Sequence, residues 1–231
     1  MIEVLKNKKV IFFDVGYTLD YPASGDWMFT KKFYEIAGDR LSMSSSEAIQ
    51  KARELSLEYL EKNHLVKTTE EEYQQFTRFY SDISRYLNLS LTNEEVHIIA
   101  YDRTYNMNNY IVYPDAKEVL ELLNKSYMLG IISDTWPSIE KQLRAIGVRD
   151  YFSISTYSCS LGKFKPDEIL YKDALLKCGC RAEETVFIDD SIRNLEGAAK
   201  LGITPILIAA NPASDVDSPY LKIHSLLELL R

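Results

Sequence analysis

Short apolar runs recur along the chain, and they restrict the fold more than any other feature. Each is only a few residues long, is rich in valine, isoleucine and phenylalanine, and has little polar alternation. The runs are VIFF at 10–13, GIIS at 130–133, VFI at 186–188 and PILIA at 205–209. Such runs are typical of strands that are buried on both faces, as in a parallel sheet.

Helical patterns separate these predicted strands in the second half of the chain. They cover residues 116–125, 138–146, 167–177 and 192–201. Gly147 and Gly202 follow two of them at positions where a helix commonly ends. Strands that alternate with helices in this way predict an α/β fold with a doubly wound parallel sheet.

The stretch from Asp20 to Tyr110 breaks this alternation, because it contains no comparable strand run. Its pattern indicates helices throughout, with capping boxes predicted at Ser44/Glu47, Thr68/Glu71 and Thr92/Glu95. We therefore expect two domains. Residues 1–19 and 111–231 would form the α/β core, and residues 20–110 would form an all-helical domain inserted after the first strand.

Composition excludes several classes of protein. The 231 residues are 46% hydrophobic and 26% charged, which is typical of a globular protein. The net charge of −7, with no basic stripe, argues against binding to nucleic acid or an anionic membrane, and it suits a metal cation as partner. No apolar run is long enough to span a bilayer, and three cysteines without framework spacing predict a cytoplasmic location. The oligomeric state stays open.

Chemically useful side chains follow three of the predicted strands. Asp14 follows the first, Ser133 ends the second, and Asp189 and Asp190 follow the third. Lys165 lies in a loop just before the helix that begins near residue 167. Because ligands gather at the carboxyl ends of parallel strands, this set could bind a metal-bound phosphate.

Simpler roles are open for some of these residues. Asp190 or Ser191 could cap the helix from Ile192, and Lys165 could be a solvated loop lysine. Asp14 needs a partner because it ends a buried strand. Two carboxylates about 4 Å apart repel by about 4 kcal/mol at an effective dielectric of 20, and a divalent cation reverses that repulsion. Mg²⁺ is the natural candidate, because it combines one or two carboxylates with phosphate oxygens.

Four segments together resemble the motifs of one known family. They are FFDVGYTLD at 12–20, GIISDT at 130–135, KFKPDEILY at 163–171 and FIDDSIRNLEGAAKLGI at 187–203. In this order, and with a helical insertion after the first, they resemble the haloacid dehalogenase-like hydrolases. The insertion point is similar to that of the subgroup with a helical cap. The resemblance covers almost the whole chain.

The resemblance implies catalytic roles for three residues. Asp14 would be the nucleophile that forms an aspartyl-phosphate. Ser133 and Lys165 would bind the phosphoryl oxygens and stabilise the charge of the transition state. The substrate would be a small phosphorylated metabolite.

The resemblance also implies a Mg²⁺ site. Asp14, the backbone carbonyl of Gly16 and Asp190 would hold the ion. Asp189 would assist as a further carboxylate that orients Lys165 or a metal-bound water.

One position departs from the family pattern. Phosphatases of the family usually carry a second aspartate two residues after the nucleophile, as general acid and base, and here that residue is Gly16. Such a group contributes about 10²–10⁴ in rate. Asp20, Asp26, Lys31 and Lys32 are candidate replacements.

The sequence therefore favours a Mg²⁺-dependent phosphatase and leaves two alternatives open. One is a family member that cleaves a carbon–phosphorus or carbon–halogen bond, since those relatives also lack the second aspartate. The other is a binding or regulatory protein that keeps the phosphate site and has lost turnover.

Overall fold

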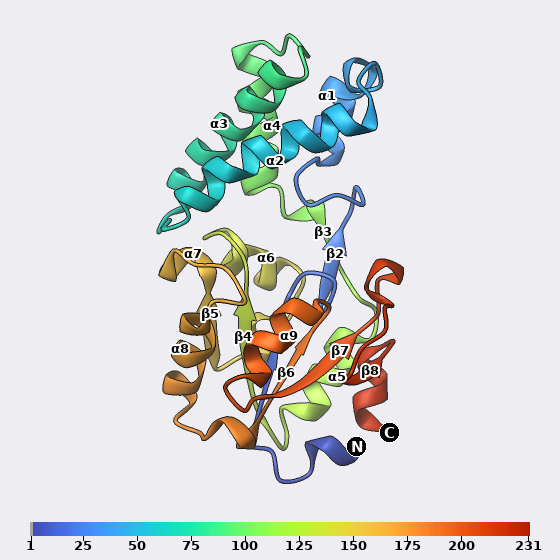
Figure 1. The fold of residues 1–231 in the computed structure, drawn as a ribbon, viewed down its shortest axis with the longest axis vertical. Helices are drawn as coiled ribbons and strands as arrows, with labels where there is room; N and C mark the ends of the chain where they lie inside the picture. The colour runs from blue at the N-terminus through green and yellow to red at the C-terminus, as the bar shows by residue number, and fades with distance from the viewer. Residues whose placement is uncertain (1) are drawn as a thin grey trace.

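A six-stranded parallel sheet forms the centre of the molecule (Figure 1). The computed structural model describes residues 2–231, and it confirms the predicted α/β fold. The strands lie in the order β5-β4-β1-β6-β7-β8, and every neighbouring pair is parallel. Their bounds are β1 Val10–Phe13, β4 Met128–Ser133, β5 Ile154–Tyr157, β6 Thr185–Asp189, β7 Thr204–Ile208 and β8 Leu221–Ile223.

Both faces of the sheet are covered by helices. These are α5 (Ala116–Leu123), α6 (Ile139–Ala145), α7 (Ser158–Leu161), α8 (Glu168–Cys178) and α9 (Ile192–Ala199). In β1, Ile11 and Phe13 belong to the same apolar cluster as α5 and α6, while Val10 and Phe12 belong to the cluster of α8 and α9. Successive side chains of a strand point to opposite faces, so all four residues of the VIFF run are buried.

The strand order places a topological switch at β1. The chain proceeds from β1 to β4 and β5 on one side, and then returns to β6, β7 and β8 on the other. In open α/β sheets, ligands bind where the strand order reverses, outside the carboxyl ends of the strands. The ends of β4, β1 and β6 therefore lie next to one another at the place where a site is expected.

Four helices between β2 and β3 lie at one end of the sheet (Figure 1). We call residues 31–105 the helical insertion. It comprises α1 Lys31–Leu41, α2 Ser46–Lys62, α3 Thr69–Tyr86 and α4 Asn93–Tyr105. Its interior is an apolar cluster of its own, rich in aromatic side chains such as Phe33, Phe76 and Tyr80.

The starts of the helices in the insertion agree with two of the three predicted capping boxes. Capping boxes form at Thr68 with Glu71 and at Thr92 with Glu95, as predicted. The prediction of Ser44 as a cap was wrong by one residue. Ser45 is the N-cap of α2, and its side chain accepts from the amide of Ala48. Three consecutive serines make the exact start ambiguous in the sequence.

Two short strands join the insertion to the sheet. β2 (Asp20–Pro22) pairs antiparallel with β3 (Tyr110–Val112), so the expectation of helix from Asp20 onward was wrong at this end. The pairing brings the two connecting segments side by side. The domain boundaries after residues 19 and 110 stay a prediction, although they fall at this junction.

The remaining differences between the predicted and the observed elements concern short strands at the sheet edges and short turns. β5 and β8 were not predicted, because ISTY and LKI have only four and three residues. Short 3₁₀ turns lie at Glu3–Leu5, Met107–Asn109, Arg149–Tyr151, Ala182–Glu184, Pro212–Ser214 and Leu226–Leu230. Among residues 2–231, no helix combines the length and apolar character that a membrane span requires. The three cysteines are unpaired.

Candidate active site

Three carboxylates meet at the ends of β1 and β6. Asp14 follows β1 directly, and its amide donates to the carbonyl of Ile188 at 2.9 Å, which fixes it beside β6. Asp189 ends β6, and Asp190 follows it. One oxygen from each of the three carboxylates lies within 4.8 Å of the others. The structure thus brings together the acidic residues that the sequence predicted.

Lys165 lies between two of these carboxylates. Its Nζ is 2.8 Å from Oδ1 of Asp14 and 2.7 Å from Oδ2 of Asp189, and it also donates to the Ile132 carbonyl at 3.2 Å. The side chain is buried, so the alternative of a solvated loop lysine is wrong. Burial alone would lower its pKa, but Asp14, Asp189 and Asp134 outweigh burial and raise the pKa well above its usual value.

Asp189 is fully buried, and both of its oxygens are already occupied. Oδ1 accepts from the Ser191 amide at 2.8 Å, and the Asn194 side chain donates to Oδ1 at 3.0 Å and to Oδ2 at 3.1 Å. Together with Lys165, these donors fill the lone pairs that a metal would need. Asp189 therefore positions Lys165, and Asp190 is the better placed ligand.

Asp190 does not cap the helix that follows it. Its Oδ2 accepts from the Ser214 hydroxyl at 2.9 Å, and Ser191, the N-cap of α9, makes no side-chain capping hydrogen bond. The simpler role for these residues was therefore wrong. Asp190 lines the cavity beside Asp14.

The electrostatics of this edge favour an added cation. Burial, and then the charges of Asp14 and Asp189, raise the pKa of Asp190 to about 7. Burial raises the pKa of Asp189 and of Asp134 to about 6, against the opposing effect of Lys165. Among residues 2–231, the Lys165 ammonium pairs with Asp14 and Asp189 alone, so the negative charge of the four carboxylates exceeds the positive charge beside them, and a divalent ion would offset the excess.

The donor set fits a hard divalent cation. Asp14 and Asp190 offer carboxylate oxygens, and the turn after β1 offers the carbonyl of Gly16. That carbonyl accepts no hydrogen bond within residues 2–231, whereas the neighbouring Val15 carbonyl accepts from the amides of Thr18, Leu19 and Asp20. Oxygen ligands of these kinds are the ones that Mg²⁺ prefers.

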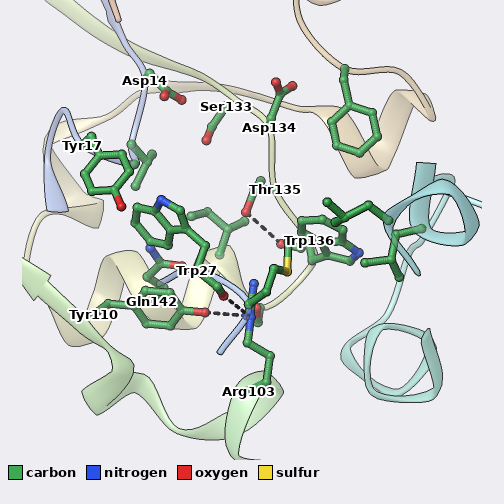
Figure 2. A pocket seen from close by; sticks show the side chains of 18 of the residues that line it. Asp14, Tyr17, Trp27, Arg103, Tyr110, Ser133, Asp134, Thr135, Trp136 and Gln142 are labelled. Atoms are coloured by element: carbon green, nitrogen blue, oxygen red, sulfur yellow. Dashed lines mark hydrogen bonds between the residues drawn. The ribbon is translucent and has the colours of Figure 1, made fainter. Parts of the chain in front are cut away.

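A cavity of about 320 Å³ lies between the sheet edge and the helical insertion. From the core it is lined by residues 14–17 and 133–136, and from the insertion by Leu57, Leu60, Glu61 and Arg103. Figure 2 shows Asp14 and Ser133 at one end of this cavity. The Ser133 hydroxyl makes no hydrogen bond to any described residue, so it is available to a ligand.

Polar contacts hold the insertion over this cavity. The Glu72 carboxylate accepts from both the amide and the hydroxyl of Ser138, each at 2.7 Å, and the Trp136 indole donates to Gln75 at 3.0 Å. His64, buried against Phe164, lies 2.7 Å from the Ser158 hydroxyl. Burial lowers the pKa of His64 to about 4, so this contact involves a neutral imidazole.

An aromatic side chain lies directly beside Gly16. A Cβ at this position would lie 3.0 Å from Cζ2 of Trp27, so the indole occupies the space beside it. A side chain at position 16 would therefore press against this indole.

The candidate replacements for that acid lie elsewhere. Asp20 is buried beneath the site and accepts from Gln142 at 2.6 Å. Asp26 accepts from the amides of Met28 and Phe29 and pairs with Arg53, while Lys32 pairs with Glu35. Neither these three residues nor Lys31 is among those that line the cavity.

The cavity contains functional candidates that the sequence analysis missed. They are Trp27, Glu61, Arg103, Asp134 and Trp136. Arg103 carried a signal in the sequence, because it continues the spacing of Val96, Ile99 and Ala100 along one helix face. A charged residue on an apolar stripe needs an explanation.

Comparison with known proteins supports the family that the four sequence motifs indicate. The pattern of the haloacid dehalogenase-like hydrolases matches residues 39–208, which is more than half of the chain. The chain belongs to this family. A glyceraldehyde 3-phosphate phosphatase from Methanothermobacter thermautotrophicus is 25% identical over 210 residues, covering 87% of this chain and 85% of that protein. A phosphoserine phosphatase from Thermus thermophilus is 26% identical over 125 residues, 52% of this chain and 50% of that one.

Solved structures of this hydrolase family share the fold. A phosphatase of the family from Thermococcus onnurineus superposes with a TM-score of 0.64, at 23% identity, over 96% of this chain and 95% of that one. At this identity the likeness shows the fold alone.

Replacing Lys165 tests the charge balance of the site. With EDTA present, Lys165→Met should lower the free energy of unfolding by about 3–5 kcal/mol at pH 8, because it leaves carboxylates buried without their cation. The loss should be smaller at pH 5. The pKa of Asp189, already about 6, rises further without the ammonium, so the penalty grows as the pH rises through that value.

Urea unfolding at pH 5 and pH 8 measures both values. Lys172→Met is the matched control, because Lys172 pairs with Glu168 at the exposed surface, and it should change stability by less than about 0.5 kcal/mol. A loss for Lys165→Met that is equal at the two pH values would contradict the charge balance.

Proposed function

We propose that this hydrolase removes the phosphoryl group from a small phosphorylated metabolite through an aspartyl-phosphate at Asp14. One observation carries the proposal: Lys165 holds Asp14 at one end of the cavity, beside a free hydroxyl at Ser133. The two relatives described above are named as phosphatases, which supports phosphate esters as the substrate class.

In the proposed reaction, an oxygen of Asp14 attacks phosphorus and the ester oxygen departs. Lys165 and the Ser133 hydroxyl bind the phosphoryl oxygens, whose charge spreads in the transition state. Water then attacks phosphorus, which releases phosphate and regenerates the Asp14 carboxylate. Asp189 and Asn194 keep Lys165 in place.

Asp14, the Gly16 carbonyl and Asp190 would hold Mg²⁺. The ion would neutralise the charge of the phosphate and of the carboxylates around it. The helical insertion would act as the cap that excludes bulk water and selects the substrate.

We also propose a reducing cytoplasmic environment, which suits the three free cysteines, and no nucleic-acid or membrane partner.

The alternatives have less support. Carbon–phosphorus cleavage requires a lysine of the insertion in the cavity, and none of the lysines of the helical insertion lines it. Dehalogenation requires no metal, whereas the carboxylates of Asp14, Asp189 and Asp190 lie close enough together to hold one cation. A binding protein without turnover has the same phosphate site, so activity measurements must distinguish it.

Hydrolysis of para-nitrophenyl phosphate tests the proposal. Its leaving group needs little protonation, so the reaction should proceed with Mg²⁺ despite the glycine at position 16. EDTA and Asp14→Asn should each abolish it, with at least about a thousandfold loss for the variant, because the nucleophile is removed. Glu168→Gln, at the exposed start of α8, is the control and should retain activity. Equal rates for the wild type and Asp14→Asn would rule out the proposed mechanism.

A second variant series tests the role of position 16. Gly16→Asp alone should not raise activity on alkyl phosphates, because Trp27 occupies the adjacent space. Gly16→Asp combined with Trp27→Ala should exceed Trp27→Ala alone by at least about tenfold, since a general acid contributes about 10²–10⁴. The measurement is kcat on an alkyl phosphate. A gain for Gly16→Asp by itself would show that the indole does not block the position.

A further inference from the structure

Arg103 is a buried cation in the wall of the cavity. It lies near the end of α4, and only 6% of its surface is exposed. Its guanidinium packs over the Phe76 ring, with Cζ 4.4 Å from the ring centroid. A charge at such a place is costly unless something binds it.

Protein groups use only part of its donor capacity. Nε donates to the Trp27 carbonyl at 3.0 Å, and Nη1 donates to the Tyr110 hydroxyl at 2.7 Å. A guanidinium has five N–H donors, so two are used and three, one on Nη1 and two on Nη2, have no partner within residues 2–231. The two bonds and the stacked ring hold the plane of the guanidinium in one orientation.

No carboxylate of the described chain forms an ion pair with Arg103. Glu72 is close enough to influence its pKa, but both Glu72 oxygens are held by Ser138. Asp102 accepts instead from Asn106 and Asn109. The positive charge of Arg103 is therefore available to a ligand in the cavity.

We propose that Arg103 binds a carboxylate of the substrate, at the end of the cavity opposite the phosphate. This inference rests on the proposed phosphatase function and deepens it, because it makes the substrate a phosphorylated carboxylic acid. Figure 2 shows Asp14 and Ser133 at one end and Arg103 at the other, with Trp27 between them. A molecule bound at both ends would span the cavity along its aromatic wall.

The geometry favours a carboxylate over a second phosphate. Nη1 and Nη2 each carry a free N–H donor, and a planar carboxylate can accept from both nitrogens at once. A phosphate dianion would require more positive charge than one guanidinium supplies, and the carboxylate of Glu61 also lines the cavity.

If Arg103 only stabilised the structure, its replacement would change activity in a different way. Its bonds to Trp27 and Tyr110 connect α4 to the junction with the sheet, so a variant could lower activity on every substrate equally. Discrimination between charged and uncharged substrates separates the two roles.

The test compares ω-carboxyalkyl phosphates of increasing chain length with the corresponding carboxamides. For the wild type with Mg²⁺, kcat/KM should favour the carboxylate by about tenfold or more at the best length, because hydrogen bonds between charged groups discriminate at this level. Arg103→Gln should bring the ratio close to one, and Arg103→Lys should retain part of it. Arg85→Gln, on the exposed surface of α3, should leave the ratio unchanged.

The outcomes separate this inference from the proposed function. If the wild type shows a ratio of carboxylate to carboxamide kcat/KM near one at every chain length, the carboxylate site is overturned, and this result does not depend on whether Arg103→Gln folds. The site is also overturned if Arg103→Gln leaves the wild-type ratio unchanged. A stronger preference for alkyl bisphosphates assigns the site to a second phosphate and overturns it also. If para-nitrophenyl phosphate is hydrolysed in an Asp14-dependent manner in these cases, the phosphatase function stands. If no ester is hydrolysed in an Asp14-dependent manner, both the carboxylate site and the phosphatase function are overturned.

Discussion

The ion pairs of Lys165 with Asp14 and Asp189 are the interactions on which the sheet edge depends. The strand order puts the ends of β1 and β6 next to each other, where Asp14 follows β1 and Asp189 ends β6. Without a cation between them, two buried carboxylates would repel and would be protonated near neutral pH. Lys165 reaches them from the loop before α8 and turns this repulsion into attraction. The same ammonium then lies where a phosphoryl oxygen would be bound.

The helical insertion adds a second set of constraints to this edge. Its contacts through Glu72, Gln75 and His64 close a cavity over the carboxylates, and Arg103 and Trp27 determine the shape of that cavity. The acidic end is suited to a divalent ion and a phosphate, while the far end presents an unpaired guanidinium. Trp27 fills the space beside Gly16, so the shape of the cavity and the missing acid have a common structural origin.

Much of the core and the acidic cluster could be predicted from the sequence, because both depend on local patterns. The VIFF run predicts a doubly buried strand, and Asp14, Ser133 and Asp189 follow from their places at strand ends. The edge strand β5 could not be predicted, because ISTY has only four residues and two of them are serine and threonine. Arg103 and Trp27 could not be placed, because their function depends on how the insertion packs against the sheet. No local pattern shows that Asp26 is occupied by backbone amides.

Trapping of the acyl-phosphate tests the central claim most directly, which is that Asp14 is the covalent nucleophile. The enzyme is mixed with Mg²⁺ and para-nitrophenyl phosphate and quenched in acid, and the denatured protein is treated with borohydride, which reduces an aspartyl-phosphate to homoserine. Peptide mass spectrometry should find homoserine at position 14 and none when substrate is omitted. Hydrolysis of the ester with an unmodified Asp14, or with the modification at another carboxylate, would contradict the account.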